Sequence, residues 1–232
     1  MFSSAIIVAA GSGKRLGSSL PKQFLKLNSK PILSHTIEKF ENCCFINEII
    51  VVVPFDYLDH AKSEVVNCYK FEKVKKVIPG GDTRQSSVFN GLKEVDDTSE
   101  IVVIHDGARP FVSTDDIAAS IECAKTEGAC IIGVKAKNTI KSVELDGFVA
   151  DTLIRDSLYE VQTPQTFKRE LITAAYENSE KNGFFATDDS ALVERLGAKV
   201  KIIDGSYKNI KITTEEDLLF AKMILSEAKD VN

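Results

Sequence analysis

The chain has 232 residues, of which 44% are hydrophobic and 27% charged, a composition typical of a globular protein with a substantial core. Its 34 acidic residues outnumber its 29 basic ones, and the net charge of −5 argues against a nucleic-acid-binding protein. No run of 18 apolar residues occurs, so we expect no membrane contact, and residues 1–4 lead straight into an apolar run without the features of a signal peptide.

The cysteine and histidine pattern excludes the common zinc sites. The five cysteines include no C-x-x-C pair, and the three histidines lie far apart in the sequence. An odd number of cysteines without metal-binding spacing is typical of reduced, mostly buried thiols. We therefore expect a cytoplasmic protein and no protein-bound metal.

The first element predicted along the chain is a strand at residues 5–10 (AIIVAA), buried on both faces. The loop that follows combines Gly11, Gly13 and Gly17 with the cations Lys14, Arg15 and Lys22. Glycines let backbone N–H groups approach a ligand, and guanidinium and ammonium groups pair with phosphate. The spacing G-x-G-x-x-x-G matches neither the dinucleotide fingerprint nor the Walker loop. A phosphate-binding loop of another type is one interpretation, and a flexible connection with solvated charges is the other.

Apolar runs and helical periodicities then alternate along the chain, with turn residues between them. Four repeats of strand, loop and helix indicate a parallel sheet with right-handed crossovers, covered by helices on both faces. The expected strands are residues 49–53, 73–78, 101–104, 129–134 and 200–203. Helices are expected after Lys30, through residues 58–69 and 88–95, and after a cap at Ser113. Further helices are expected at residues 168–181, from the Thr187 cap to residue 196, and at 218–225 after a cap at Thr214.

The alternation breaks after residue 134. Residues 139–144 and 148–151 flank Leu145-Asp146-Gly147, and Asp-Gly is a hairpin signal. We predict a β-hairpin arm at 137–153 that projects from a single domain of residues 1–232. Residues 153–167, around Pro164, are expected to be irregular. Thr187 is the expected N-terminal cap of the helix that follows.

Polar clusters follow several of the predicted strands, at the edge where an open parallel sheet binds ligands. They lie at residues 11–22, 80–87, 106–109 and 209–211. Each cluster also has a purely structural interpretation. Asp106 and Arg109 suit a local ion pair, and Lys211, between Ile210 and Ile212, suits the solvated side of an edge strand.

Several of these stretches together resemble one family. Residues 9–17 (AAGSGKRLG) and 21–23 (PKQ) are similar to the signature loop of nucleotidyltransferases that join a sugar or polyol phosphate to a nucleotide. In order and spacing, the chain resembles the 2-C-methyl-D-erythritol 4-phosphate cytidylyltransferases of the isoprenoid pathway, through residues 80–92 (GGDTRQSSVFNGL), 103–111 (VIHDGARPF), 162–167 (QTPQTF), 187–194 (TDDSALVE) and 209–218 (NIKITTEEDL). The chain departs from the usual pattern at Gly107, where alanine is common, and at Asn138, where aspartate is common.

The resemblance implies a Rossmann-like α/β fold and a reaction of CTP with methylerythritol phosphate, assisted by Mg²⁺ held mainly through the CTP phosphates. It implies a homodimer with exchanged arms. The implied catalytic residues are Arg15, Lys22, Arg155 and Lys211. The implied nucleotide contacts are Ala9, Ala10, Gly11, Ser12, Gly13, Gly81, Asp82, Arg84, Ser87 and Gly107. The implied acceptor contacts are Asp106, Arg109, Arg155, Thr163, Thr187 and Lys211.

Two other functions remain open at this point. Ribitol-5-phosphate cytidylyltransferases share the PKQ and NIKITT strings, but usually carry Leu-Ala-Gly-Gly where this chain has residues 9–12 (AAGS). A non-catalytic nucleotide-binding relative would keep the fold and lose the cations. A nicotinamide dehydrogenase is disfavoured, because the glycine spacing it needs is absent.

Overall fold

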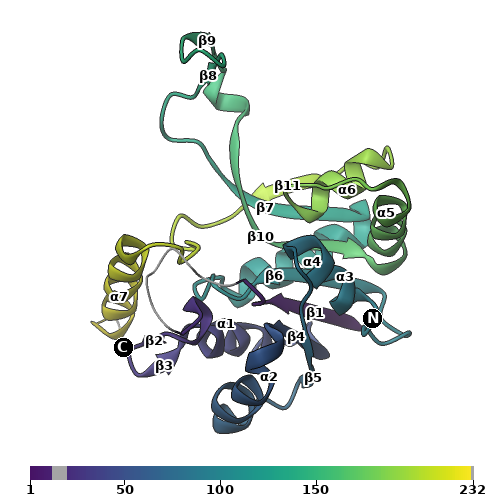
Figure 1. The fold of residues 1–232 in the computed structure, drawn as a ribbon, viewed down its shortest axis with the longest axis vertical. Coiled ribbons are helices and arrows are strands. Elements are labelled where there is room, and N and C mark those ends of the chain that lie inside the picture. Colours follow the sequence, from purple (N-terminus) through teal and green to yellow (C-terminus); the bar gives the residue numbers. More distant parts are fainter. Residues whose placement is uncertain (12–19, 231–232) are drawn as a thin grey trace.

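The computed structural model describes residues 1–11 and 20–230, and within them it shows a seven-stranded sheet with helices on both faces (Figure 1). The strand order is β11-β7-β10-β6-β1-β4-β5. The bounds are β1 (Ser3–Val8), β4 (Glu48–Val53), β5 (Val74–Pro79), β6 (Ile101–Asp106), β7 (Ala129–Lys135), β10 (Tyr159–Lys168) and β11 (Lys201–Asp204). Every neighbouring pair is parallel except those of β10, which runs antiparallel to both β6 and β7. The predicted mostly parallel α/β fold is confirmed.

The central strands are apolar on both sides, and alternate residues supply the two halves of the core. On β1, Ile7 packs in one hydrophobic cluster and Ile6 in the other. The first cluster lies under helices α1 (Ile32–Glu41) and α4 (Thr114–Glu127) and under the helical segment that starts at α2 (Leu58–His60). The second lies under α3 (Arg84–Leu92), α5 (Arg169–Asn182) and α6 (Asp189–Arg195). Continuous apolar runs were therefore sufficient to predict these strands.

Most of the predicted helix ends are confirmed. Ser113 accepts a hydrogen bond from the Asp116 N–H at the start of α4, and Gly128 ends that helix with a φ of +91°. Helix α7 (Glu215–Asp230) begins after Thr214, whose hydroxyl accepts from the Asp217 N–H. The predicted Thr187 cap is wrong by one residue, because the Asp188 carboxylate accepts from the Ala191 N–H instead.

Strand β10 corrects the prediction that residues 153–167 are irregular. Its stretch Gln162–Thr166 is polar and contains Pro164, which does not read as a central strand. The pairing of β10 with β7 shifts register between Val161 and Gln165, so Pro164 falls where the ladder makes no regular pair. The polar side chains are buried with hydrogen-bond partners from distant parts of the chain, described below.

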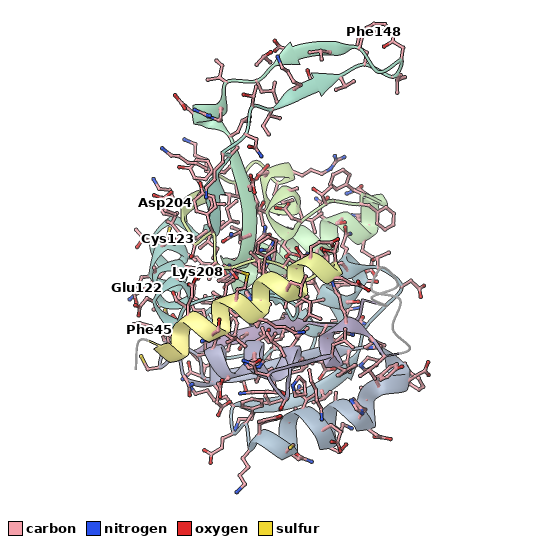
Figure 2. The ribbon with its side chains drawn as sticks, turned by 90° about the vertical axis from the view of Figure 1, so that its left-hand side faces the viewer. Phe45, Glu122, Cys123, Phe148, Asp204 and Lys208 are labelled. Atoms are coloured by element: carbon pink, nitrogen blue, oxygen red, sulfur yellow. The ribbon has the colours of Figure 1, made fainter. Side chains whose placement is uncertain are left out.

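The predicted arm is present as a hairpin of β8 (Lys141–Val143) and β9 (Val149–Thr152). Its turn closes with the Gly147 N–H donating to the Glu144 carbonyl, at a Gly147 φ of +92°. Figures 1 and 2 show the hairpin standing away from the sheet on a stalk continuous with β7 and β10, with Phe148 at its tip. Phe148 is 74% exposed, so the arm buries little against its own chain.

Two smaller elements complete the fold. The strands β2 (Lys26–Leu27) and β3 (Lys30–Pro31) form a short hairpin, on which helix α7 packs through Ala221. None of the helices within the described residues is long and apolar enough to cross a membrane.

Candidate active site

A pocket of about 370 Å³ opens at the carboxyl ends of β1 and β6. It lies where the loops after parallel strands converge, which is the usual ligand position in such sheets. The lining residues are Val8, Ala9, Ala10, Gly11, Lys22, Gln23, Gly81, Asp82, Thr83, Arg84, Ser87, Asp106, Ala108 and Lys211. The structure therefore brings together residues from all four predicted polar clusters.

The first wall is the segment after β1, which ends at Val8, two residues earlier than predicted. Ala9 and Ala10 consequently belong to the pocket rather than to the strand. The buried side chain of Gln23 donates hydrogen bonds to the carbonyls of Ala9, at 2.5 Å, and Gly11, at 3.2 Å. These bonds tie the beginning of the loop to its end and fix the turn Lys22–Phe24 that carries Lys22.

Three of the predicted site residues, Ser12, Gly13 and Arg15, lie outside the described residues. Gln23 was not among the predicted site residues. Its place in the PKQ string, directly after Lys22, is the sequence signal for it.

The second wall is the turn before α3. A Cβ atom at Gly80 would lie 2.3 Å from the Cβ of Ala10, so glycine is required where the two loops meet. Thr83 caps α3 in a reciprocal pair with Ser86, and the Ser87 hydroxyl donates to the Thr83 carbonyl at 2.8 Å. The turn is thus held by hydrogen bonds among its own residues, and Gly81 and Asp82 line the pocket.

Asp106, at the end of β6, is the charge centre of the pocket. Its Oδ1 accepts from Arg84 Nε at 3.1 Å, and its Oδ2 lies 2.7 Å from Lys211 Nζ and 3.7 Å from Arg109 Nε. Burial alone would raise the pKa of Asp106, but the charges of Arg84 and Lys211 hold it well below its usual range. One buried carboxylate in the pocket lining therefore gathers three cations.

Arg84 is held from its other side by Asp189. Both guanidinium nitrogens Nη1 and Nη2 donate to the Asp189 carboxylate, at 3.0 and 2.8 Å, and the Tyr176 hydroxyl donates to the same carboxylate at 2.5 Å. Burial opposes the charge on Arg84, but the attraction of Asp189 and Asp106 outweighs it and raises the arginine pKa. Arg84 was predicted as a nucleotide contact. It lines the pocket, yet its guanidinium is engaged by two carboxylates.

The sequence did not predict Asp189 as a site residue, although the string TDDSALVE contains it. Gln165 on β10 fixes this helix start by accepting from the Asp189 and Ser190 N–H groups, both at 3.0 Å, and donating to Asp188 at 2.8 Å. Strand β10 therefore holds Asp189, the partner of Arg84, in place through the side chain of Gln165.

A second network from β10 orients Asp106. The Thr163 hydroxyl accepts from the Asp106 N–H at 3.0 Å and lies 3.1 Å from His105 Nδ1. His105 Nε2 lies 3.0 Å from the Arg109 carbonyl, which can only accept, so the proton is on Nε2 and Nδ1 accepts from Thr163. His105 is fully buried, and burial lowers its pKa to about 4, so it is neutral at physiological pH.

This buried histidine leads to a prediction about pH and stability. Its pKa is about 4 in the folded chain and 6.5 in the unfolded chain, so only the unfolded chain takes up the proton as the pH falls from 6.5 to 4. The stabilisation is complete above pH 6.5, and about 3 kcal/mol of it should be lost by pH 4. In a His105→Gln variant, urea unfolding at pH 7, 6, 5 and 4.5 should show a correspondingly weaker pH dependence. His35, whose pKa burial also lowers, contributes equally to both proteins, and identical pH profiles would contradict the prediction.

The structure does not place all predicted contacts on the pocket surface. Gly107 lies behind the wall, where an added Cβ would stand 2.8 Å from that of Ala9. Thr163 is buried and Arg109 is nearly so, and both lie beside Asp106. Thr187 is exposed beside α6, and Arg155 is exposed at the foot of the arm, where it donates to the Lys137 carbonyl at 3.1 Å.

No group of three or more His, Cys, Asp or Glu side chains is placed to hold a metal ion in the described part of the chain. Both oxygens of Asp106 already face cationic side chains.

Comparisons with known proteins agree on one family. Residues 3–227 match the profile of the family described as "2-C-methyl-D-erythritol 4-phosphate cytidylyltransferase". The enzyme of that name from Alkaliphilus oremlandii is 48% identical over 227 residues, which are 98% of this chain and 96% of the relative. The one from Clostridioides difficile is 47% identical over 97% of this chain and 94% of its own.

Solved structures agree with these sequence matches. The crystal structure of 4-diphosphocytidyl-2C-methyl-D-erythritol synthase from Anaerococcus prevotii superposes with a TM-score of 0.87 at 38% identity, covering 97% of this chain and 96% of that one. A 2-C-methyl-D-erythritol 4-phosphate cytidylyltransferase from Thermus thermophilus superposes with a TM-score of 0.79 at 30% identity, over 97% of this chain and the whole of that one. The chain belongs to the 2-C-methyl-D-erythritol 4-phosphate cytidylyltransferase family.

Proposed function

We propose that the pocket between β1 and β6 is the active site at which this chain carries out its family's reaction, the transfer of a cytidylyl group from CTP to 2-C-methyl-D-erythritol 4-phosphate in the non-mevalonate pathway. The observation that carries the proposal is that two lysines far apart in the sequence, Lys22 and Lys211, line one pocket. Lys211 forms an ion pair there with Asp106. Cations converging on a glycine-containing loop suit a site where two phosphate groups must meet.

The reaction begins with attack of a phosphate oxygen of the acceptor on the α-phosphorus of CTP. A new P–O bond forms, the bond from the α-phosphorus to the bridging oxygen breaks, and pyrophosphate leaves. The attacking oxygen is already ionised at neutral pH, since the second pKa of a phosphate monoester is about 6. No general base is needed, and His105 is not available as one because both its ring nitrogens are engaged. Catalysis then rests on positioning and on cations that stabilise the growing charge.

We assign the cations Arg15 and Lys22 to the α-phosphate and the leaving group. The nucleotide would lie against Ala9, Ala10, Gly11, Gly81, Asp82 and Ser87, as the family resemblance implies, with Ser12 and Gly13 completing the loop. Lys211 and Asp106 would face the acceptor. Arg84, Arg109 and Thr163 support this arrangement through their contacts with Asp106.

The family's reaction depends on a metal ion, and we propose that the ion is Mg²⁺ carried mainly by the phosphates of CTP. Mg²⁺ usually keeps several waters and binds through substrate phosphates with one or two protein oxygens at most. The donor set of the pocket fits this, because it offers two carboxylates among the described residues: Asp106, which is engaged by cations, and Asp82, which forms no ion pair with them. When bound, Mg²⁺ neutralises phosphate charge.

The acceptor is tested by a pyrophosphate-release assay with CTP and Mg²⁺ held constant. We expect methylerythritol 4-phosphate to give the larger kcat/KM and ribitol 5-phosphate to be a poor acceptor. A larger kcat/KM for ribitol 5-phosphate would overturn the acceptor assignment and leave cytidylyl transfer intact.

We also propose that the protein is a homodimer whose arms exchange, so that Arg155 of one protomer reaches the acceptor in the other's site. The exposed apolar side chains of the arm, Val143, Leu145, Phe148 and Val149, need a partner surface. Swapping an identical element is a common way to form a two-fold dimer. Arg155 does not line the pocket of its own chain, which supports a role in the partner's site.

Complementation between two variants whose activity is strongly reduced tests this arrangement. Arg155→Ala and Lys211→Ala proteins are mixed and allowed to exchange subunits. In a heterodimer one site carries both lesions and the other carries neither, so we expect up to about half the native activity per heterodimer. No recovered activity despite demonstrated exchange would show that Arg155 acts within its own chain.

The cellular location is the last part of the proposal. All five cysteines are unpaired in the structure. Cys43 and Cys130 are buried, but Cys44 and Cys68 are exposed, so the prediction of mostly buried thiols is wrong. Reduced thiols are typical of cytoplasmic proteins, so we propose a cytoplasmic enzyme.

A further inference from the structure

The segment that carries Lys211 has no regular secondary structure. It connects β11 to α7 over residues 205–214, and Lys211 reaches Asp106 from it. A lysine ammonium sits on a flexible stem of four carbons, so its position depends on how firmly the main chain beneath it is held. The question is which contacts hold this segment against the site.

The strongest anchor is Asn209, two residues before Lys211 and fully buried. Its side-chain amide Nδ2 donates to the Thr163 carbonyl at 2.9 Å and to Gln162 Oε1 at 3.2 Å. The orientation of this amide is unambiguous, because the Thr163 carbonyl can only accept. The Gln162 amide is fixed in the same way, since its Nε2 donates to the Ser206 carbonyl at 2.9 Å.

Asn209 is also connected to the charged cluster through its main chain. Its carbonyl accepts from Arg109 Nη1 at 2.8 Å. On the other side of Lys211, the Ile212 N–H donates to the Ala108 carbonyl at 2.9 Å. The stretch that bears Lys211 is therefore clamped at both ends, by Asn209 to β10 and by Ile212 to the loop after Asp106.

We infer that Asn209 is a positioning residue for the reaction: its two amide donors hold the main chain so that Lys211 and Arg109 meet at Asp106. This position requires the two N–H donors of a side-chain amide. Its Oδ1 makes no hydrogen bond within the described structure, so the acceptor half of the amide contributes nothing there. The inference rests on the proposed role of Lys211 toward the acceptor.

The direct test is Asn209→Asp, which keeps the size of the side chain and removes both donors. A carboxylate oxygen would then face the Thr163 carbonyl oxygen. Both atoms only accept hydrogen bonds, so no rotation of the aspartate side chain could restore the lost bond. We expect kcat/KM for methylerythritol 4-phosphate to fall on the order of 10–100-fold, as for a misplaced binding group, with KM for CTP near its native value. Lys208→Ala is the matched control, because this neighbour is exposed, pairs with Glu227 and lies beside α7 (Figure 2). The control should keep native kinetics.

A double-mutant cycle separates positioning from a purely structural effect. Asn209→Ala, a second variant that introduces no charge, is measured in the native and the Lys211→Ala backgrounds, with urea unfolding of each protein. If Asn209 acts through Lys211, its substitution should cost much less acceptor kcat/KM once Lys211 is absent. Additive losses, or a loss shared equally by acceptor and CTP, would overturn the inference and leave the proposed function standing. If Lys211→Ala alone leaves acceptor kinetics unchanged, the proposed role of Lys211 is wrong, and the inference fails with it.

Discussion

Replacing Lys22 by alanine is expected to lower kcat by about 10²–10³-fold while changing the KM for CTP much less. Negative charge grows on the α-phosphate and on the departing pyrophosphate as the reaction proceeds. Only interactions that strengthen in the transition state raise kcat. Lys22 lines the pocket, and its main chain is fixed by the buried neighbours Gln23 and Phe24, so its ammonium is presented to the site in a defined place.

Steady-state kinetics with CTP and methylerythritol 4-phosphate varied separately provide the measurement. Lys26→Ala is the matched control, since Lys26 is an exposed lysine on β2 that does not line the active-site pocket. The control should retain native kcat. If Lys22→Ala raises KM for CTP and leaves kcat intact, Lys22 only anchors the ground state, and its assignment to the transition state is wrong.

Asp189→Asn is expected to cause a large loss of stability, although it leaves the size of the side chain unchanged. The Asp189 side chain is 1% exposed and is the bidentate partner of Arg84. Removing one partner of a buried ion pair leaves the other charge uncompensated and typically costs about 3–5 kcal/mol. We expect the lower end, about 3 kcal/mol, because Arg84 keeps Asp106 as a second partner and is partly exposed.

Urea unfolding at pH 7 measures this loss, and Asp97→Asn is its control. Asp97 also pairs with an arginine, Arg169, but on the surface with its side chain fully exposed. Such pairs contribute little, so the control should unfold close to the native midpoint. Equal midpoints for the two variants would contradict a stabilising role for the buried pair. Asp189→Asn should also lower activity, because Arg84 joins Asp189 to Asp106.

The sequence by itself determined most of the fold. Strands such as β4 and β6 are continuous apolar runs because both their faces are buried. Such a run can be recognised from neighbouring residues in the sequence alone. Turn and cap residues such as Gly128 and Ser113 are equally local signals. Since parallel strands align their carboxyl ends, the sequence also indicated that Gly11, Gly81, Asp106 and Lys211 would meet at one edge, and all four line the pocket.

Only the tertiary structure decided how that edge is held together. Strand β10 is polar and contains a proline, and its residues Thr163 and Gln165 are stable in the core because their partners lie on other elements. Arg84 and Asp189 are likewise joined across 105 positions of the chain. Burying a polar group is costly unless a partner satisfies it, and a partner that distant leaves no periodic trace in the sequence. The apolar runs thus specify where the site lies, while long-range hydrogen bonds specify which side chains hold it in place.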